Sequence, residues 1–487
     1  MKQWKQSVLG CMTAGLLMMT SFPVFAADSS SDPSGKSQSV TEGSTFDDGT
    51  LTYTILKNMQ VSVTGCITTA TNISIMPKID GYTVVSIGDQ AFAGCSALQS
   101  VTMPNGITEI GDGAFQSCTS LQSVTLSNSI TEIPDGAFLS CSALTDIQLG
   151  DQITKIGRMA FAYCTSLTDM EIPDSVTEFG EQTFMGCSSL ESITLPETLE
   201  TLSAYMFQNC SALESFSIPD TMTDLGYLAF VGCRNLKTIE ISANHPTYQL
   251  QDDVLYSKDG TELFLYPAGK TGTSFTVPDG VKTISDGAFF AAPLQSVTLP
   301  EGLEWIGSGA FDYCTSLTNI TIPESVTVIQ DHAFSDCESL SSVLFAGDEE
   351  ATDNALQIGS YAFFCCEQLM DVTLPKRVTQ IGDFAFGVTE QQKVNAEGST
   401  SDETENIAVS GFLLTGYEGA AAKYISSSRS NGIRINFKSL QIPWVKIVSI
   451  SLGCTAGLVL IFLLVRIIKK KRLSAADKEA LEAAEQK

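Results

Sequence analysis

A period of 23 residues constrains this sequence more than any other feature. The stretch AFAGCSALQSV at residues 91–101 returns as AFQSCTSLQSV at 114–124 and as AFLSCSALTDI at 137–147. A phenylalanine recurs every 23 residues from Phe92 to Phe230, with a cysteine three residues later and a leucine six residues later. A strict period of this length is typical of a solenoid, in which each repeat forms one coil that stacks on the next.

The recurring positions are expected to form a buried structural ladder. Its first four coils contribute Phe92, Cys95, Leu98, Phe115, Cys118, Leu121, Phe138, Cys141, Leu144, Phe161, Cys164 and Leu167. The period is interrupted after Phe230, resumes at Phe289 and continues to Phe386. The sequence therefore predicts a solenoid of about twelve repeats, each of about 23 residues.

One repeat, residues 87–110, shows how a coil is expected to fold. Apolar residues at helical spacing over 87–95 predict a short helical turn with Asp89 as its N-cap. Alternating apolar and polar residues over 98–103 predict a strand with one buried face. A single repeat cannot bury this apolar face alone, so neighbouring coils must cover it. The predicted fold class is accordingly an α/β solenoid.

The repeat resembles that of a known family. The pattern I-G-x-x-A-F-x-x-C-x-x-L-x-x-V-x-x-P, as in Ile87–Pro104, recurs about a dozen times over residues 86–386 and is similar to the BspA-like family of surface leucine-rich repeat proteins. Several members of that family act in adhesion to host matrix or to other cells. The resemblance thus implies a leucine-rich repeat ectodomain that binds extracellular or cell-surface ligands. Here the cysteine precedes the strand, so no asparagine ladder is expected.

The rest of the chain divides around the repeats. The predicted parts are a signal peptide (1–26), a flexible leader (27–45), an N-terminal β cap (46–85), repeats (86–242 and 284–386), a hairpin insertion between them (243–283), an acidic linker (387–410), a C-terminal cap (411–443), a transmembrane helix (444–468) and a cytoplasmic tail (469–487). Asp259-Gly260 is the expected turn of the hairpin. The linker is expected to be a loop, and the C-terminal cap to hold a small helix around Ala420–Tyr424 and a strand at Ile433–Phe437.

Both ends of the chain indicate export and anchoring. Val24-Phe25-Ala26 places small residues where a signal peptidase cleaves, after an uncharged apolar run. Ile447–Val465 is uncharged and long enough to span a bilayer, and the basic residues at 469–472 follow it. Because positive clusters stay in the cytoplasm, we expect a single-pass cell-membrane protein with an extracellular N-terminal region and a cytoplasmic C-terminus.

The predicted exported region is strongly acidic. Residues 27–443 hold 17 Lys and Arg against 51 Asp and Glu. Such a surface repels nucleic acid and anionic lipid, so no nucleic-acid partner is expected. The expected partners are extracellular or envelope proteins, together with the membrane through the C-terminal helix.

The cysteines allow three interpretations: disulfides, metal ligands or a packed core. Ten of the fourteen occupy the repeat position. Side chains on adjacent parallel strands keep their Cβ atoms near the strand spacing of about 4.8 Å, whereas a disulfide needs about 3.8 Å. A metal site needs converging ligands, and the repeats lack a CxxC pair. We interpret the column as a ladder of small apolar residues, with scattered disulfides as the alternative. Cys66, Cys365 and Cys454 lie off the column and receive no role.

The sequence points to binding and not to catalysis. It lacks the GxSxG, HExxH and phosphate-loop motifs, so no enzyme activity is expected, and no catalytic, cofactor-binding or metal-binding residue is predicted. Outward strand positions carry hydroxyls and carboxylates without aromatic anchors. The candidate binding surface is Asp146, Gln148, Asp169 and Glu171. The insertions at 243–283 and 347–357 interrupt this regular surface, and such loops carry function more often than the scaffold does. The alternative function is an ectodomain scaffold or receptor for an envelope or membrane protein complex.

Overall fold

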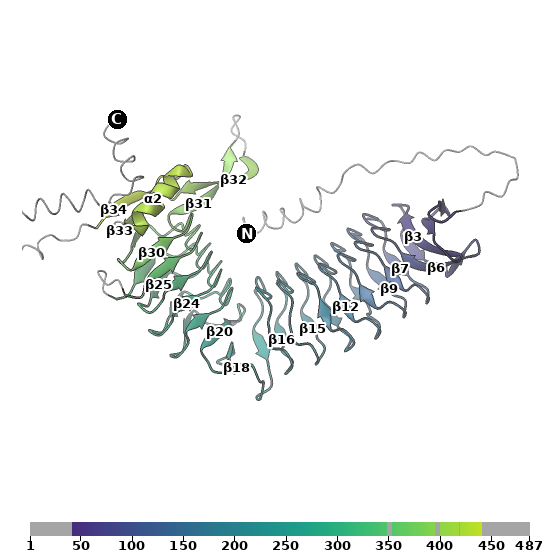
Figure 1. Cartoon of the computed structure of the whole chain (residues 1–487), viewed down its shortest axis with the longest axis horizontal. Coiled ribbons are helices and arrows are strands. Elements are labelled where there is room, and N and C mark those ends of the chain that lie inside the picture. The colour runs from purple at the N-terminus through teal and green to yellow at the C-terminus, as the bar shows by residue number, and fades with distance from the viewer. Residues whose placement is uncertain (1–40, 348–352, 395–399, 418, 441–487) are drawn as a thin grey trace, which may run out of the picture. The chain divides into compact units, whose positions relative to one another are not determined.

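The structure is a computed structural model that describes residues 41–347, 353–394, 400–417 and 419–440 (Figure 1). The predicted signal peptide, transmembrane helix and cytoplasmic tail lie outside these residues. The chain separates into two units, Met1–Ser44 and Thr45–Lys487, and the second unit contains all the secondary structure described below. Within the described ranges no helix combines the length and the apolar character that crossing a bilayer requires.

A mixed sheet opens the second unit. Its strands are β1 (Thr45–Asp47), β2 (Leu51–Ile55), β3 (Gln60–Cys66), β5 (Lys78–Ile79) and β6 (Tyr82–Ile87), in the order β1-β2-β3-β6-β5. The first three strands pair antiparallel, whereas β3 pairs parallel with β6. Strand β6 then pairs parallel with β8 (Glu109–Ile110) of the first coil, and β4 (Asn72–Ser74) pairs parallel with β7 (Ser100–Thr102). This sheet therefore supplies the surface on which the first coil stacks.

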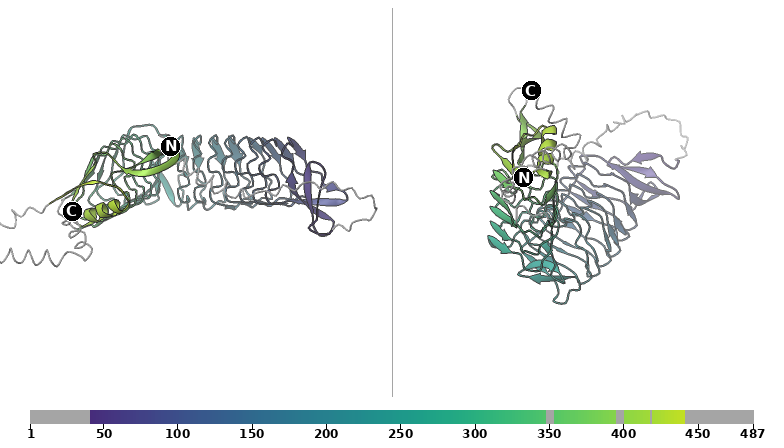
Figure 2. Two further views of the ribbon diagram at one scale, coloured as in Figure 1. Left: turned by 90° about the horizontal axis from the view of Figure 1, so that it is seen from above. Right: turned by 60° about the vertical axis from the view of Figure 1, so that its left-hand side comes forward.

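Most coils place short strands on two faces of the stack; the coils at Thr201 and Asp224 have only an isolated bridge between these two residues on the second face. The primary-strand face contains β7, β9 (Ser123–Thr125), β11 (Asp146–Ile147), β13 (Asp169–Glu171), β15 (Ser192–Thr194), β16 (Ser215–Ser217), β17 (Thr238–Glu240), β21 (Ser274–Thr276), β23 (Ser296–Thr298), β25 (Asn319–Ile322), β27 (Ser342–Phe345) and β29 (Asp371–Thr373). The secondary-strand face contains β8, β10 (Glu132–Ile133), β12 (Lys155–Ile156), β14 (Glu178–Phe179), β22 (Thr283–Ile284), β24 (Trp305–Ile306), β26 (Val328–Ile329), β28 (Leu356–Ile358) and β30 (Val378–Ile381). Equivalent strands pair parallel, 23 residues apart in β7 and β9, so the predicted solenoid of stacked repeats is confirmed. Both views of Figure 2 show the coils side by side.

The expected helical turn in each coil is wrong. The segment between the secondary strand and the cysteine consists of turns, and two residues in it take a left-handed conformation, such as Gly113 and Ser117, both with φ 60°. Asp89 does not cap a helix: its Oδ1 accepts a hydrogen bond from the backbone N–H of Asp112 in the next coil, at 3.0 Å. The one α-helix of the described residues is α2 (Ala420–Ser430), so the coils themselves are built from strands and turns.

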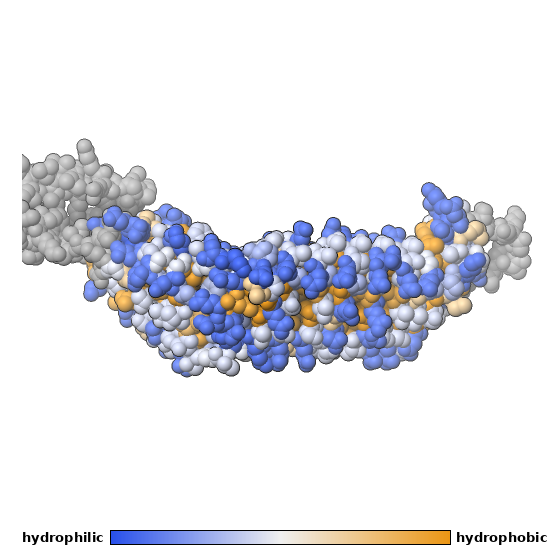
Figure 3. Space-filling view, turned by 90° about the horizontal axis from the view of Figure 1, so that it is seen from below, coloured by the Kyte–Doolittle hydropathy of each residue, from blue (hydrophilic) through white to orange (hydrophobic). Residues whose placement is uncertain are grey.

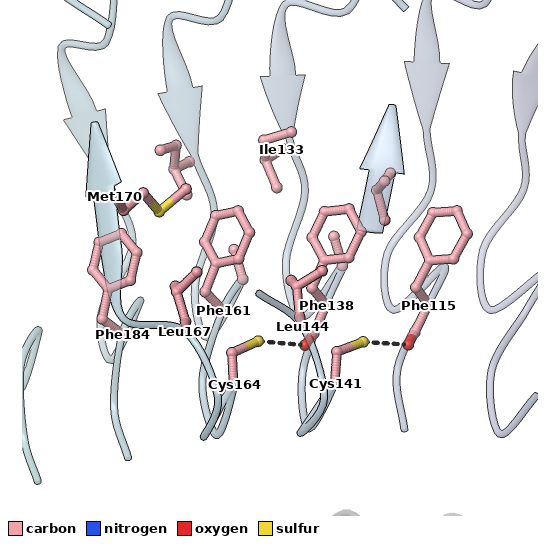
Figure 4. Packing of buried hydrophobic residues seen from close by; sticks show 14 of the residues in the cluster. Phe115, Ile133, Phe138, Cys141, Leu144, Phe161, Cys164, Leu167, Met170 and Phe184 are labelled. Atoms are coloured by element: carbon pink, nitrogen blue, oxygen red, sulfur yellow. Dashed lines mark hydrogen bonds between the residues drawn. The ribbon is translucent and has the colours of Figure 1, made fainter. Parts of the chain in front are cut away.

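A column of stacked phenylalanine rings forms the core (Figure 4). The ring centroids of Phe115 and Phe138 lie 5.3 Å apart and those of Phe138 and Phe161 5.4 Å apart, with interplanar angles of 4° and 8°. All three side chains have 0% exposure. Aromatic pairs add about 0.5–1.5 kcal/mol beyond their burial, so the repeated ring stabilises the interfaces at which two rings stack.

The cysteine column does more than fill space. The thiol of Cys141 donates to the carbonyl oxygen of Phe115 in the preceding coil at 3.1 Å, and Cys164 donates to Phe138 at 3.3 Å. The same bond recurs in other coils, from Cys118 to Phe92 and onward to Cys366. All the cysteines that the structure describes are free thiols. A small side chain with a weak donor suits this position because the turn leaves the phenylalanine carbonyl facing the next coil.

We expect the column thiols to react only when the protein unfolds. Burial raises the pKa of Cys118 and of Cys187 to about 12, which suppresses the reactive thiolate at neutral pH. Titration of the full chain with a thiol reagent should label few column cysteines in buffer and most of them in guanidinium. Cysteines from Cys118 onward in the column that stay unlabelled in guanidinium, but become reactive after reduction, would contradict this interpretation.

The C-terminal end differs from expectation in one segment. Residues 387–410 are not a loop: β31 (Val388–Val394) and β32 (Thr400–Ala408) form an antiparallel hairpin. After the hairpin, β33 (Leu413–Gly416) pairs with β29 and with β34 (Asn436–Ser439), and α2 lies between β33 and β34. The Tyr424 hydroxyl of α2 donates to the carbonyl of Phe386 at 2.6 Å and accepts from its N–H at 2.8 Å. This side chain satisfies the backbone of the last ring in the phenylalanine column.

Candidate functional site

The site arises where residues 243–283 depart from the repeat. Three strands, β18 (Tyr248–Gln251), β19 (Val254–Ser257) and β20 (Glu262–Leu265), pair antiparallel in sequence. Asp259 Oδ1 organises the β19–β20 turn by accepting from the hydroxyls of Ser257 at 2.6 Å and Thr261 at 2.8 Å. These hydrogen bonds lower the pKa of Asp259 to about 2, and the one from Ser257 contributes most. The segment therefore forms a hairpin whose turn is held by side-chain hydrogen bonds.

The hairpin leads into a coil that the sequence analysis did not recognise. Tyr266 occupies the phenylalanine position: its ring stacks on Phe289 with centroids 5.2 Å apart, and its N–H donates to the carbonyl of Ala288 at 2.8 Å. Tyr266 lies 23 residues before Phe289, so the period itself could have identified it. Strand β20 pairs parallel with β22, within an eight-stranded sheet that begins at β18 and continues through β30.

This degenerate coil has a shortened turn. Leu263 of β20 pairs with Ile284 of β22. Ile284 precedes the column residue Phe289 by five positions, whereas Leu263 precedes Tyr266 by three. The shorter connection leaves a hollow of about 400 Å³ on the secondary-strand face, between the preceding coil at 223–231 and the following coil at 283–287. We call it the junction hollow.

Exposed aromatic rings line the junction hollow. Tyr227 is 46% exposed and Trp305 is 38% exposed, which is unusual for such large side chains in this stack. Tyr205 packs edge-on against Tyr227, with ring centroids 5.4 Å apart and an interplanar angle of 87°. Phe264 is half-buried in the wall of the hollow and packs edge-on against Tyr248, with ring centroids 5.2 Å apart. The hollow thus offers aromatic surface that the rest of the strand faces do not.

Three carboxylates share the hollow with these rings. Each has one oxygen fixed by a neighbour: Asp224 accepts from the N–H of Gly226 at 2.8 Å, Asp286 from the N–H of Ser308 at 2.6 Å, and Glu262 from the hydroxyl of Ser285 at 2.6 Å. The described residues that line the hollow include no Lys, Arg or His. The hollow is therefore a preorganised anionic site, because its carboxylates are held without a cationic partner in the lining.

The tyrosines respond to this charge. The pKa of Tyr205 is raised to about 12, mainly by burial and less by Tyr227 and the carboxylates of Glu181 and Asp286. The pKa of Tyr248 is also raised to about 12, mainly by burial and less by the carboxylates of Asp224 and Glu262. Both phenols therefore stay neutral across the physiological range and remain hydrogen-bond donors.

The candidate surface named from the sequence lies elsewhere. Asp146, Gln148, Asp169 and Glu171 line a second hollow of about 470 Å³ on the primary-strand face. It forms where the β4-β7-β9-β11 sheet ends and the β13–β15 pair begins. The structure brings all four exposed residues together, but the residues around this hollow include no aromatic side chain. We call it the strand-face hollow.

The histidine of the hairpin insertion and the insertion at 347–357 have structural roles. His245 is fully buried, with Nε2 2.9 Å from the carbonyl of Pro219 and Nδ1 accepting from the N–H of Tyr248 at 3.2 Å. The insertion at 347–357 lies partly outside the described residues, and its described end contributes β28. In the part of the chain that the structure describes, no group of three or more His, Cys, Asp or Glu side chains is arranged to hold a metal. The face drawn in Figure 3 is mostly hydrophilic, with apolar side chains in a broken line along it.

Comparison with known sequences gives one family. The family described as "BspA type Leucine rich repeat region" matches in six copies over residues 69–188, 154–259, 266–389 and 348–409. These ranges include β18 and β19 of the hairpin and the degenerate coil from Tyr266 onward, and they leave out residues 260–265, which contain β20. No curated protein matches the chain.

One solved structure of a bacterial protein shares the fold, and another matches with a lower score. A leucine rich cell surface protein from Faecalibacterium prausnitzii is 30% identical with a TM-score of 0.62, over 78% of this chain and 96% of that one. A leucine-rich repeat protein from Bacteroides ovatus is 26% identical with a TM-score of 0.40, over 68% of this chain and 95% of that one.

Proposed function

Because the chain belongs to the BspA type leucine-rich repeat family, we propose that it is a non-catalytic binding module of the cell surface whose ligand site is the junction hollow. The family match and the cell surface protein from Faecalibacterium prausnitzii support a surface location. The acidic predicted ectodomain and the absence of catalytic motifs support binding over catalysis. Within this proposal the coils are the scaffold, and the irregular coil carries the site.

The observation that carries the proposal is the exposure of Tyr227 and Trp305 beside three fixed carboxylates. Trp and Tyr are enriched among the residues that dominate binding energy, because they bury large rigid surfaces at low entropic cost. The strand faces, by contrast, present Ser, Thr, Asp and Glu, which are good solvated strand residues. The strand-face hollow is consequently the weaker candidate.

The chemistry of the hollow selects cationic side chains. A lysine or arginine over an aromatic face gains about 0.5–2 kcal/mol from the ring quadrupole, and more if a carboxylate completes its hydrogen bonds. An acidic protein attracts basic partners over long range, which raises the association rate at low salt. We assign the hollow to a lysine- or arginine-bearing segment of an extracellular or envelope protein.

The predicted membrane anchor determines which partners the repeats can reach. The uncharged segment Ile447–Val465 and the basic residues after it support a single-pass anchor with the repeats outside the cell. If a thick wall lies outside the membrane, a membrane-held ectodomain reaches envelope proteins more readily than host matrix. This supports the second function, a receptor or scaffold for an envelope complex.

The ligand chemistry predicts how simple probes behave. The full chain should bind a lysine 20-mer saturably at low salt, and Tyr227→Ala/Trp305→Ala should weaken that binding roughly 30-fold, as expected when two aromatic hot spots are removed. Fluorescence anisotropy with a labelled peptide measures both affinities. A glutamate 20-mer should not bind, because the site and the probe repel each other.

A matched variant separates the site from general charge. Asp146→Asn/Asp169→Asn removes two carboxylates from the strand-face hollow and should leave lysine-peptide affinity within about twofold of the parent, because it leaves the rings and the three carboxylates of the junction hollow intact. Equal losses in both variants would show non-specific attraction and contradict the assignment. Binding of an N-acetylglucosamine hexamer in place of the lysine peptide would keep the site and overturn its cationic ligand.

A further inference from the structure

Two cysteines meet where the N-terminal sheet covers the first coil. Cys66 is the last residue of β3, and Cys95 is the first member of the cysteine column. Their Sγ atoms lie 3.1 Å apart, although the residues are 29 positions apart in sequence. Cys95 is buried with 2% exposure, whereas Cys66 is partly exposed.

This pair departs from the pattern of the column. In later coils the thiol donates to the phenylalanine carbonyl of the preceding coil, as Cys118 does to Phe92 at 3.0 Å. Cys95 has the N-terminal sheet before it and no preceding phenylalanine coil, and its thiol contacts the thiol of Cys66. Cys66 Sγ also lies 3.1 Å from the carbonyl of Ile67, which holds it at the end of the strand.

We propose that Cys66 and Cys95 form a disulfide that joins the N-terminal sheet covalently to the first coil. A disulfide has an S–S distance of about 2.05 Å, so roughly 1 Å of approach is needed. Cys66 is the last residue of β3, so its backbone can shift by this amount without breaking the pairing of the strand. The column cysteines, which bond to backbone carbonyls, stay reduced.

The reaction consumes one external disulfide. The Cys66 thiolate, on the accessible side, attacks a sulfur of a small-molecule disulfide or an oxidoreductase disulfide and releases one thiolate. The Cys95 thiolate then attacks the sulfur of Cys66 in the mixed disulfide and releases the second thiolate. Two protein thiols are oxidised, the external disulfide is reduced to two thiols, and the protons of the protein thiols pass to the leaving thiolates. An exported chain meets such oxidants.

The bond would protect the open end of the solenoid. A solenoid exposes its core at both ends and depends on caps to cover it. The N-terminal sheet buries Val61 and Val63 of β3 with 0% exposure, in one core with Phe92. Closing a 29-residue separation restricts the unfolded ensemble of this end and leaves later coils unchanged.

Mass spectrometry tests the bond directly. The native full chain is incubated with oxidised glutathione, denatured, alkylated and digested with trypsin plus a protease that cleaves after Asp and Glu. These cleavages place Cys66 in peptide 58–78 and Cys95 in peptide 90–109, apart from Cys118 and Cys141. The expected product is a linked pair of these two peptides. Hydrogen exchange in β2 and β3 should slow roughly 100-fold on oxidation.

Two variants keep the test falsifiable. Cys66→Ala should abolish the linked pair and the change in exchange, while Cys118→Ala, which removes a column thiol, should keep both. Alkylated Cys66 and Cys95 after oxidation of a folded sample, verified by circular dichroism, would overturn the proposal. So would linkage of Cys66 to Cys118. None of these outcomes depends on ligand binding, so this inference stands or falls apart from the proposed function.

Discussion

Replacing Phe138 with alanine is expected to lower the free energy of unfolding by about 3–5 kcal/mol, as truncation of a buried aromatic ring does. The ring has 0% exposure and lies between Phe115 at 5.3 Å and Phe161 at 5.4 Å, so its loss leaves a cavity with two unstacked neighbours. The coils on both sides hold their own backbone pairings and cannot collapse freely into the space. Equilibrium unfolding in urea, followed by circular dichroism, measures the change.

The control is an aromatic residue of similar size outside the column. Tyr227→Ala removes a ring that is 46% exposed and should cost far less, about 1 kcal/mol or below. A solenoid distributes its stability over neighbouring interfaces, so the Phe138 defect should also split the unfolding transition. A Phe138→Ala loss as small as that of Tyr227→Ala would show that the ring column does not hold the coils together.

Gly180→Ala is expected to cost about 3 kcal/mol or more, near the upper end for overpacking. A Cβ at Gly180 would lie 2.2 Å from the backbone nitrogen of Arg158 and 2.6 Å from the carbonyl carbon of Gly157. These are backbone atoms of the preceding coil, so the clash is relieved only by separating the two coils. Guanidinium unfolding and the thermal midpoint both report the loss.

Gly150→Ala is the matched control, since a Cβ there would meet nothing within 4 Å. It should change the free energy of unfolding by about 0.5 kcal/mol or less. Equal stability of the two alanine variants would contradict the close approach of the coils at Gly180.

The period predicted much of the scaffold because each coil repeats the same burial problem. Phe92, Cys95 and Leu98 are all at 2% exposure or less, as a residue facing the axis of a stack must be. What the period did not reveal was the conformation between these residues. Spacing that suits a helical face also suits a tight turn. The positive φ of Ser117 and of Ser140 is incompatible with a right-handed helix, so these segments form turns. The carbonyl that each thiol meets depends on that turn, so it was not predictable either.

Two segments differ from the sequence prediction for different physical reasons. The hairpin at 388–408 is rich in Thr, Glu and Gln and lacks the apolar alternation that marks a half-buried strand, so the sequence favoured a loop. The degenerate coil was hidden because tyrosine replaces phenylalanine at Tyr266 and glycine stands at the cysteine position, Gly269. The pattern depends on residue type, whereas the coil needs only a flat ring in the column.

The junction hollow follows from a register that no motif encodes. It exists because Leu263 pairs with Ile284, while the connection from Leu263 to Tyr266 is two residues shorter than the one from Ile284 to Phe289. That pairing is a tertiary contact, which no local pattern in the sequence predicts. Tyr227 and Trp305 belong to different coils, 78 positions apart, and only the missing turn brings them to one opening. The sequence indicated the region, through the break at 243–283, but not the residues.

Surface plasmon resonance on the full chain tests the central claim, that the junction hollow is the ligand site. The parent, Tyr227→Ala/Trp305→Ala and Asp146→Asn/Asp169→Asn proteins are passed over matrix proteins, wall glycans and envelope extract at low and high salt. The account predicts saturable, salt-weakened binding to a protein partner that the junction variant loses and the strand-face variant keeps. Binding retained by a folded junction variant and lost by the strand-face variant would contradict it.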